Sequence, residues 1–313
     1  MNKLKTWLQT TPYKEYRLSI ASADASFRKY YRIEYEKKSF IVMDSSLELD
    51  SLKPFLDVTK RLLDADVKAP KIYEQNLELG YLVLEDFGNT NLLDNLDRTN
   101  FERLYLKALD VIIKMQDAKT EKLPLYDKEF LHFEMALMQE WYLEKKLNIQ
   151  LNTKQENILN TTLDAISTVV LSQPQNTFVH RDFHSRNIML RVKDELGIID
   201  YQDAMSGAIT YDLVSLLKDC YIEFEREKIV QLALAFKLKK GLAVDDATFI
   251  KWFDFMGMQR HIKVLGVFSR LHLRDNKDGY LQDIPLTLKY TLDALWRYAE
   301  TKELAKLLRE FTV

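Results

Sequence analysis

Three side chains that carry oxygen donors stand close together in the sequence and could perform phosphoryl transfer. The stretch FVHRDFHSRNIML (178–190) supplies Asp182 and Asn187, and the stretch GIIDYQDA (197–204) supplies Asp200. Phosphoryl transfer needs a carboxylate that orients the attacking hydroxyl and accepts its proton, and it needs hard oxygen ligands for Mg²⁺. We expect Asp182 to be the proton acceptor and the other two to be metal ligands. Each alone could equally be a turn or strand-end residue, but the order and spacing of all three favour a site.

The elements that position these residues differ along the chain. Short strands are expected around the loop at 178–200. Upstream, 30–35 and 39–44 alternate like a β-hairpin, 79–87 is typical of a buried strand, and 52–67 has helical spacing. After Phe87 the apolar periodicity becomes helical, as in 103–116, 157–171 and the segments from 209 onward.

These patterns predict an α+β fold with two lobes. A chain of 313 residues is long for a single core. We expect residues 1–87 to form a small β-rich, nucleotide-binding lobe that ends in a hinge. Residues 88–313 would form a larger helical lobe with the catalytic loop and the acceptor site.

The composition narrows the class of partner. Hydrophobic residues make up 47% and charged residues 29%, with a formal net charge of −2. This balance gives no indication of binding to nucleic acid or to a membrane surface. The N-terminal stretch lacks the apolar run of a signal peptide, and the single cysteine, Cys220, is expected to be an inert core thiol in a reducing compartment. We therefore expect a cytoplasmic monomer that acts on a small molecule.

The motifs resemble a known superfamily. The stretches HRDFHSRN, GIIDYQDA and TYDLVSLL are similar to the catalytic segment of the aminoglycoside phosphotransferase and choline kinase superfamily. The resemblance rests on His184, where protein kinases favour Lys, and on the run Asp200-Tyr201-Gln202-Asp203. It implies a bilobal protein-kinase-like fold and the use of ATP and Mg²⁺. It also implies that His180 and Asp212 support the catalytic loop, and Asp203 is a further candidate contact to the acceptor.

The triplet Asp86-Phe87-Gly88 spells the metal-binding motif of protein kinases but stands in the wrong place. The metal aspartate of that fold follows the HRD loop, whereas this triplet precedes it. The resemblance instead places LVLEDFG at the hinge, where backbone groups near Glu85 and Phe87 would bind adenine. We do not expect Asp86 to bind metal.

The nucleotide lobe departs from the protein-kinase pattern, since it has neither a Gly-rich loop nor a Val-Ala-Ile-Lys strand. Met43 and Asp44 stand where the phosphate-binding Lys is expected. Small residues followed by cations in SADASFRKYYR (22–32) offer a replacement, because backbone N–H groups and an Arg fork both bind phosphate. The candidate nucleotide contacts there are Ser26, Phe27, Arg28 and Arg32. A solvated basic strand is the alternative.

The same stretches, together with FIVMD and LVLEDFG, resemble one subfamily of that superfamily: the bacterial anomeric sugar kinases, which also replace the strand Lys by Met-Asp. The resemblance implies ATP-dependent phosphorylation of N-acetylmuramate or N-acetylglucosamine at C1, in peptidoglycan recycling. Two alternatives stay open. One is another small-molecule kinase of the superfamily, of aminoglycoside, choline or homoserine type, and the other is a pseudokinase that binds nucleotide without turnover.

Candidate acceptor contacts come mainly from the basic segment 259–277. Arg is well shaped to receive a carboxylate such as that of N-acetylmuramate. Arg260, His261 and Arg274 are candidates, and Glu140 is another because it stands beside Trp141 and a polar group next to a ring suits a sugar. A solvated basic helix face is the alternative for the segment.

Overall fold

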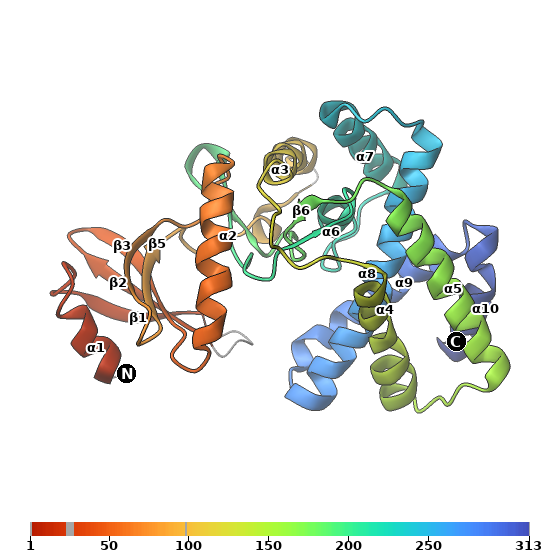
Figure 1. The fold of residues 1–313 in the computed structure, drawn as a ribbon, viewed down its shortest axis with the longest axis horizontal. Helices are drawn as coiled ribbons and strands as arrows, with labels where there is room; N and C mark the ends of the chain where they lie inside the picture. Colours follow the sequence, from red (N-terminus) through yellow and green to blue (C-terminus); the bar gives the residue numbers. More distant parts are fainter. Residues whose placement is uncertain (1, 23–27, 98, 313) are drawn as a thin grey trace. The chain divides into compact units, whose positions relative to one another are not determined.

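The computed structural model describes residues 2–22, 28–97 and 99–312. They form two compact units, one of residues 1–96 with 186–204 and one of residues 97–185 with 205–313. Figure 1 traces both along the chain. The predicted α+β fold is confirmed. Residues 186–204, assigned to the second lobe by the sequence analysis, pack with the first unit, and the lobe boundaries at 87 and 88 stay a prediction.

The first unit is built on an antiparallel sheet of five strands in the order β1-β2-β3-β5-β4. The strands are β1 (Arg17–Ser22), β2 (Lys29–Tyr35), β3 (Lys38–Asp44), β4 (Ile72–Asn76) and β5 (Tyr81–Glu85). The predicted hairpin and third strand are confirmed as β2, β3 and β5. The outer strands β1 and β4 were not predicted.

Two helices accompany this sheet. Helix α1 (Asn2–Leu8) inserts Leu4, Trp7 and Leu8 into a cluster with sheet residues such as Ile33 and Val83. The alternation of β2 sends Tyr31 and Ile33 to this face, and it sends Tyr30 and Arg32 to the other. Helix α2 (Leu52–Asp64) confirms the helix predicted at 52–67. A hairpin of β7 (Ile188–Leu190) and β8 (Leu196–Ile198) completes the unit.

The second unit is helical and centres on one long helix, α8 (Asp246–Asp275), which contacts helices on several sides, as Figure 1 shows. The others are α3 (Phe101–Met115), α4 (Lys128–Leu137), α5 (Thr153–Ser172), α6 (Tyr211–Leu217), α7 (Arg226–Lys240), α9 (Ile284–Leu295) and α10 (Lys302–Thr312). Gly266 lets α8 approach the end of α4, because a Cβ at this position would lie 2.3 Å from the backbone carbon of Leu137.

Shorter elements occur in both units. Strands β6 (Thr177–Val179) and β9 (Met205–Gly207) pair antiparallel in the second unit. A π-helix, η3 (Met138–Lys146), continues α4. Short 3₁₀ turns lie at η1 (Leu49–Ser51), η2 (Leu93–Asn95), η4 (Val192–Asp194), η5 (Asp278–Asp283) and η6 (Ala299–Thr301). Within the described residues, no helix has the length and apolar character needed to span a membrane.

Candidate active site

The two predicted metal ligands lie together in the first unit. Asn187 precedes β7 and Asp200 follows β8, so the pairing of these strands brings the residues to the same end of the hairpin. The Ile199 N–H donates to the Asn187 carbonyl at 3.1 Å, and the Asn187 amide nitrogen is 3.4 Å from an Asp200 carboxylate oxygen. Asp200 has a φ of +66°, a conformation that costs a residue other than glycine about 1–3 kcal/mol. Strained positions of this kind cluster at functional sites.

These two side chains fit Mg²⁺. Among the described residues, no three His, Cys, Asp or Glu side chains gather into a metal cage. Mg²⁺ does not need one, since it binds through one or two protein oxygens together with phosphate and water. Half a turn of the Asn187 amide would present its carbonyl oxygen beside Asp200. A hydrogen bond of 3.0 Å from the Gln202 amide holds the other Asp200 oxygen.

The residues after Asp200 anchor this corner to α2. The Tyr201 ring stacks on Phe55 at 5.3 Å between centroids, and its hydroxyl is 2.8 Å from Thr59 Oγ1. Asp203 is exposed, and its carboxylate is 3.4 Å from the Gln202 amide nitrogen. Tyr201 therefore fixes the Asp200 backbone, while Asp203 faces solvent.

The residues of the predicted hinge contact the β7–β8 hairpin. Glu85 bonds Arg191 at 2.9 Å, and the Arg191 guanidinium lies 4.4 Å from the centroid of the Phe87 ring. Phe87 also packs on Gly197, where a Cβ would lie 2.6 Å from the Phe87 ring. Any larger residue at position 197 would therefore displace that ring. These contacts fix Glu85 and Phe87 against the β7–β8 hairpin.

Asp86 forms an ion pair with Arg32. Arg32 donates from Nε at 2.5 Å and from Nη2 at 3.0 Å to the two Asp86 oxygens. Burial acts to raise the pKa of Asp86, but the bonds from Arg32 and from the Gly88 N–H outweigh it and lower that pKa. Asp86 thus serves as the counter-ion of Arg32.

Arg28 has a different environment from Arg32. It is buried at the start of β2, with Nε 3.2 Å from Ser51 Oγ, and it hydrogen-bonds Tyr30. Burial and the charge of Asp200 act to raise the pKa of Tyr30. The face of the sheet that carries Tyr30 is therefore the one near the predicted metal ligands. Ser26 and Phe27, the other predicted nucleotide contacts, lie outside the described residues.

In the second unit, the loop after β6 is tied to the start of α6. Asp212 accepts hydrogen bonds from the N–H groups of His180 at 2.8 Å and of Arg181 at 3.1 Å. His180 is fully buried, and its Nδ1 accepts from the Asp182 N–H at 3.2 Å. Arg181 has a φ of +77°, which this double anchor sustains. The contacts hold the turn that presents Asp182.

The Asp182 carboxyl is surrounded by positive charge. Burial acts to raise its pKa, but the charges of four side chains outweigh burial and lower it. In order of effect they are Lys263, His184, Arg260 and Arg181. Asp182 is therefore ionised near neutral pH, as a proton acceptor must be.

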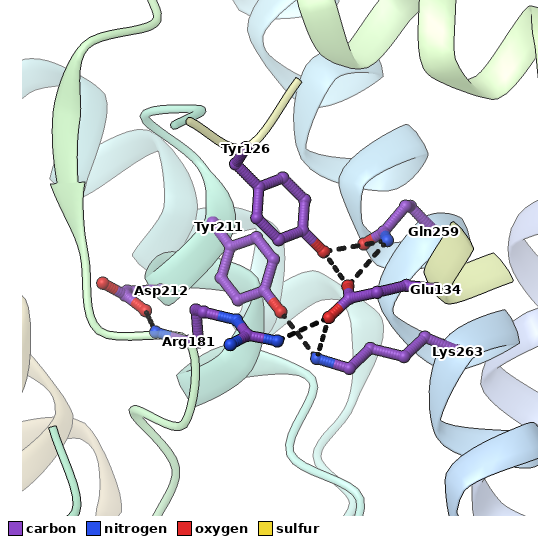
Figure 2. A network of polar contacts seen from close by, with 7 residues as sticks. All are labelled: Tyr126, Glu134, Arg181, Tyr211, Asp212, Gln259 and Lys263. Atoms are coloured by element: carbon purple, nitrogen blue, oxygen red, sulfur yellow. Dashed lines mark hydrogen bonds and ion pairs between the residues drawn. The ribbon is translucent and has the colours of Figure 1, made fainter. Parts of the chain in front are cut away.

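Behind this loop lies a buried network that sequence reasoning missed, shown in Figure 2. Glu134 on α4, 3% exposed, accepts from Arg181 Nη2 at 2.6 Å and from Lys263 Nζ at 2.9 Å. Its other oxygen accepts from the Tyr126 hydroxyl and, at 3.3 Å, from the Gln259 amide. Glu134 thus fixes two of the four side chains that act to lower the pKa of Asp182. The signal for it was a lone acid in the apolar run LHFEMALM (131–138).

The predicted acceptor contacts lie in unlike settings within this unit. Arg260 is buried; its Nη1 is 3.8 Å from Cys220 Sγ, and its Nε has no hydrogen-bond partner among the described residues. His261 is fully buried, with Nε2 2.9 Å from the Lys218 carbonyl. Of the two, Arg260 is the one whose charge acts on Asp182.

The remaining two candidates lie on the surface. Glu140 in η3 bonds Lys145 at 2.5 Å, and Lys145 covers the Trp141 ring at 3.5 Å from its centroid. Arg274 near the end of α8 bonds the neighbouring Asp275 at 2.8 Å. Both charged groups already have a local partner.

A second missed support lies after α6. Asp219 accepts from the Ser185 N–H at 2.8 Å and from its hydroxyl at 2.5 Å, which fixes the residue three positions after Asp182. The signal was the acid that follows Lys218 just after a helix whose residues are all buried.

Known proteins are similar to this chain along most of its length. The model of the phosphotransferase enzyme family matches residues 17–243. An N-acetylmuramate/N-acetylglucosamine kinase of Neisseria meningitidis is 41% identical, with 98% of this chain and 95% of the relative covered. A protein of the same name from Pseudomonas aeruginosa is 37% identical, with 92% and 86% covered. The ADP-bound structure of aminoglycoside phosphotransferase APH(2″)-Ib shares the fold, with a TM-score of 0.64, 14% identity, and 93% and 98% covered.

Proposed function

The chain belongs to the phosphotransferase enzyme family, and we propose that it is an ATP-dependent kinase of the anomeric hydroxyl of N-acetylmuramate and N-acetylglucosamine. The observation that carries the proposal is the 41% identity to a kinase of these two amino sugars along 98% of the chain. The product is the sugar 1-phosphate. The ADP bound to a structural relative of the same fold supports a nucleotide as phosphate donor.

In the proposed reaction, Asp182 accepts the proton of the sugar's C1 hydroxyl while that oxygen attacks the γ-phosphate of ATP. The new C1–O–P bond forms as the bond between the γ-phosphorus and the β,γ-bridging oxygen breaks, and ADP leaves. The positive charges that lower the pKa of Asp182 keep it ionised, and the bonds of His180 and Arg181 to Asp212 hold its loop. The anomeric hydroxyl is more acidic than other sugar hydroxyls, which suits a base of lowered pKa.

On the nucleotide side, Asn187 and Asp200 would hold Mg²⁺, which neutralises charge on the phosphates when bound. Glu85 to Phe87 would receive adenine through their backbone. Of the two candidate arginines, we assign the phosphate contact to Arg28, because the Arg32 guanidinium already binds both oxygens of Asp86. Arg32 then keeps a supporting role at the hinge.

On the acceptor side, Arg260 is the proposed contact. It is buried, its charge acts on Asp182, and its Nε has no hydrogen-bond partner among the described residues. A carboxylate could accept a hydrogen bond from the Arg260 Nε–H. N-acetylmuramate carries a carboxylate group at a position where N-acetylglucosamine carries a hydroxyl.

An acceptor panel with labelled ATP tests the proposal. We expect label transfer to N-acetylmuramate and N-acetylglucosamine, and none to 1-deoxy-N-acetylglucosamine, which lacks the anomeric hydroxyl. Transfer to choline, homoserine or an aminoglycoside with none to the amino sugars would assign the protein to another branch of the family.

An Asp182→Asn variant is the matched control, since it keeps the size of the side chain and removes the base. We expect its kcat to fall by about 10²- to 10⁴-fold, the usual contribution of a general base. If wild type and variant consumed ATP at the same sugar-dependent rate, Asp182 would not be the base. If the wild type itself showed no sugar-dependent ATP consumption, the protein would be a pseudokinase.

A further inference from the structure

Asp219, the second residue after α6, has both carboxylate oxygens engaged inside the second unit. The residue is 1% exposed. One oxygen, Oδ2, accepts hydrogen bonds from the Ser185 N–H at 2.8 Å and from the Ser185 hydroxyl at 2.5 Å. The other, Oδ1, accepts from the Tyr221 N–H at 3.1 Å. This buried acid therefore ties the catalytic loop to the segment that follows α6.

Both residues that Asp219 holds are neighbours of His184, one in the sequence and one in space. Ser185 is the next residue along the chain. Tyr221 packs against the His184 ring, with the ring centroids 5.2 Å apart and the ring planes at 79°. The His184 N–H donates to the Asp182 carbonyl at 3.0 Å, so His184 belongs to the turn that presents the proposed base. One carboxylate thus holds the backbone and the ring contact of His184.

The position of His184 affects the Asp182 carboxyl. Burial acts to raise the pKa of Asp182, and among the charges that outweigh burial His184 has the second largest effect, after Lys263. Glu134 fixes Lys263 and Arg181 by direct ion pairs. Asp219 acts on His184 less directly, through its bonds to the two neighbouring residues.

We propose that Asp219 is a positioning residue for phosphoryl transfer, which acts by holding His184 beside Asp182. The inference rests on the proposed function, since it takes Asp182 as the base. A base and its charged neighbour must keep their geometry while the attacking hydroxyl loses its proton, and a displacement of about 1 Å can slow a reaction about a hundredfold. Because Asp219 is buried, it acts through these contacts and not by touching a substrate. Its loss should therefore change kcat more than the KM for ATP.

A purely structural acid is the alternative, and Asp254 on α8 provides the comparison. Asp254 is also fully buried and also accepts three hydrogen bonds, from Arg226 at 2.6 and 2.7 Å and from the Tyr298 hydroxyl at 2.9 Å. Neither partner belongs to the catalytic loop. The loss of either acid should lower stability, but only the loss of Asp219 should lower the kcat of the folded protein.

Steady-state kinetics with N-acetylglucosamine and ATP test this role, at a temperature where circular dichroism shows each variant to be folded. Asp219→Asn keeps the size of the side chain but has one acceptor oxygen where the carboxylate has two. We expect its kcat to fall by about 10- to 100-fold, the effect of a misplaced reacting group. Its KM for ATP should stay within about twofold of the wild-type value, and so should the kcat of Asp254→Asn.

A double-mutant cycle tests whether Asp219 acts through His184. In a His184→Gln background, Asp219→Asn should lower kcat by less than about threefold, because the side chain that it positions is gone. Tyr221→Leu removes the ring contact with His184 and should lower kcat by about 2- to 10-fold, the usual contribution of an aromatic pair. This variant leaves the Asp219 carboxylate intact, so it tests the inference even if Asp219→Asn does not fold.

Three results would overturn the inference. If Asp219→Asn lost no more kcat than Asp254→Asn, Asp219 would be a structural acid only. An equal loss with and without His184 would mean that Asp219 acts through another group, and a wild-type kcat in Tyr221→Leu would remove the ring contact from the argument. A wild type without sugar-dependent turnover would overturn the proposed function and this inference with it. An active wild type beside an equally active Asp219→Asn would overturn this inference alone.

Discussion

Each unit of the protein holds an arginine–carboxylate pair of similar burial, yet the two pairs differ in charge. Arg32 and Asp86 are 18% and 2% exposed, and Arg181 and Glu134 are 18% and 3% exposed. The first is a one-to-one pair beside β5. In the second, Glu134 also takes Lys263, so two cations meet one acid.

The difference shows what each pair can do for a neighbour. A balanced pair stabilises the fold but exerts little field beyond itself. An unbalanced cluster exerts one, and the charges of Lys263 and Arg181 help to lower the pKa of Asp182. Glu134 therefore fixes the cations in place without cancelling them.

The largest expected effect is the loss of Glu134. In Glu134→Ala, Arg181 and Lys263 stay buried without their acid, and breaking a buried ion pair in this way costs about 3–5 kcal/mol. Urea unfolding at neutral pH would measure this against Glu134→Gln, which keeps hydrogen-bonding groups and should lose less. An Ala variant as stable as wild type would refute the claim that this acid holds the two buried cations in place.

The next effect concerns the buried His261, which is acted on by a different pair of cations, Lys218 and Arg260. Burial and then the charges of Lys218 and Arg260 lower its pKa from 6.5 to about 3. Between pH 6.5 and about pH 3, His261 is therefore protonated in the unfolded chain and neutral in the folded chain. The free energy of unfolding falls as the pH drops below about 6.5. By pH 5 the loss is about 2 kcal/mol.

Unfolding free energies at pH 7.5 and pH 5 check this prediction. His261→Gln has no imidazole to protonate, so its stability should fall by about 2 kcal/mol less than that of wild type over the same interval. Equal losses in the two proteins would mean that His261 takes up a proton in the folded state.

A smaller effect is expected on activity when Lys263 becomes Met. The Lys263→Met change leaves Arg181 as the one cation bonded to Glu134. It also removes the charge with the largest lowering effect on the pKa of Asp182. That pKa should rise, and the acid limb of kcat/KM should move to higher pH. Lys251→Met changes a lysine of the same helix that bonds Glu300 at 2.6 Å, and it should leave the limb in place. The same shift in both variants would point to a general charge effect.

The smallest effect is expected at the balanced pair. Asp86→Asn keeps an amide oxygen that can accept from Arg32, and Arg32 keeps its bond to the Gly88 carbonyl, so the loss of stability should be about 1 kcal/mol. Thermal unfolding would measure it. A loss as large as that of Glu134→Ala would erase the distinction between the two pairs.

The fold could be predicted because its signals are local. The alternation of 30–35 and 39–44 defines the hairpin β2–β3, and the helical spacing of 103–116 and 157–171 marks α3 and α5. Strands β1 and β4 were not predicted, because they lie at the sheet edges and are only partly buried. Apolar and polar residues therefore alternate only weakly along their sequences.

The site could be predicted in part, because the motif residues are close in sequence. Asp182, Asn187 and Asp200 belong to one segment, and their roles stay predictions. Glu134 could not be found in the same way, since its partners come from 47 and 125 residues away in Arg181 and Gln259. No local pattern tells a buried acid with distant cations from an exposed one.

The π-helix η3 determines where the chain tolerates insertions and deletions. Gly266 fixes the end of α4 at Leu137, and η3 follows immediately with wider turns than an α-helix. One residue more or less beyond this point changes the width of those turns. One residue more or less between Glu134 and Leu137 would instead rotate the glutamate by about 100° around the helix axis, away from Arg181 and Lys263. The length of the chain is thus adjustable on one side of Leu137 and fixed on the other.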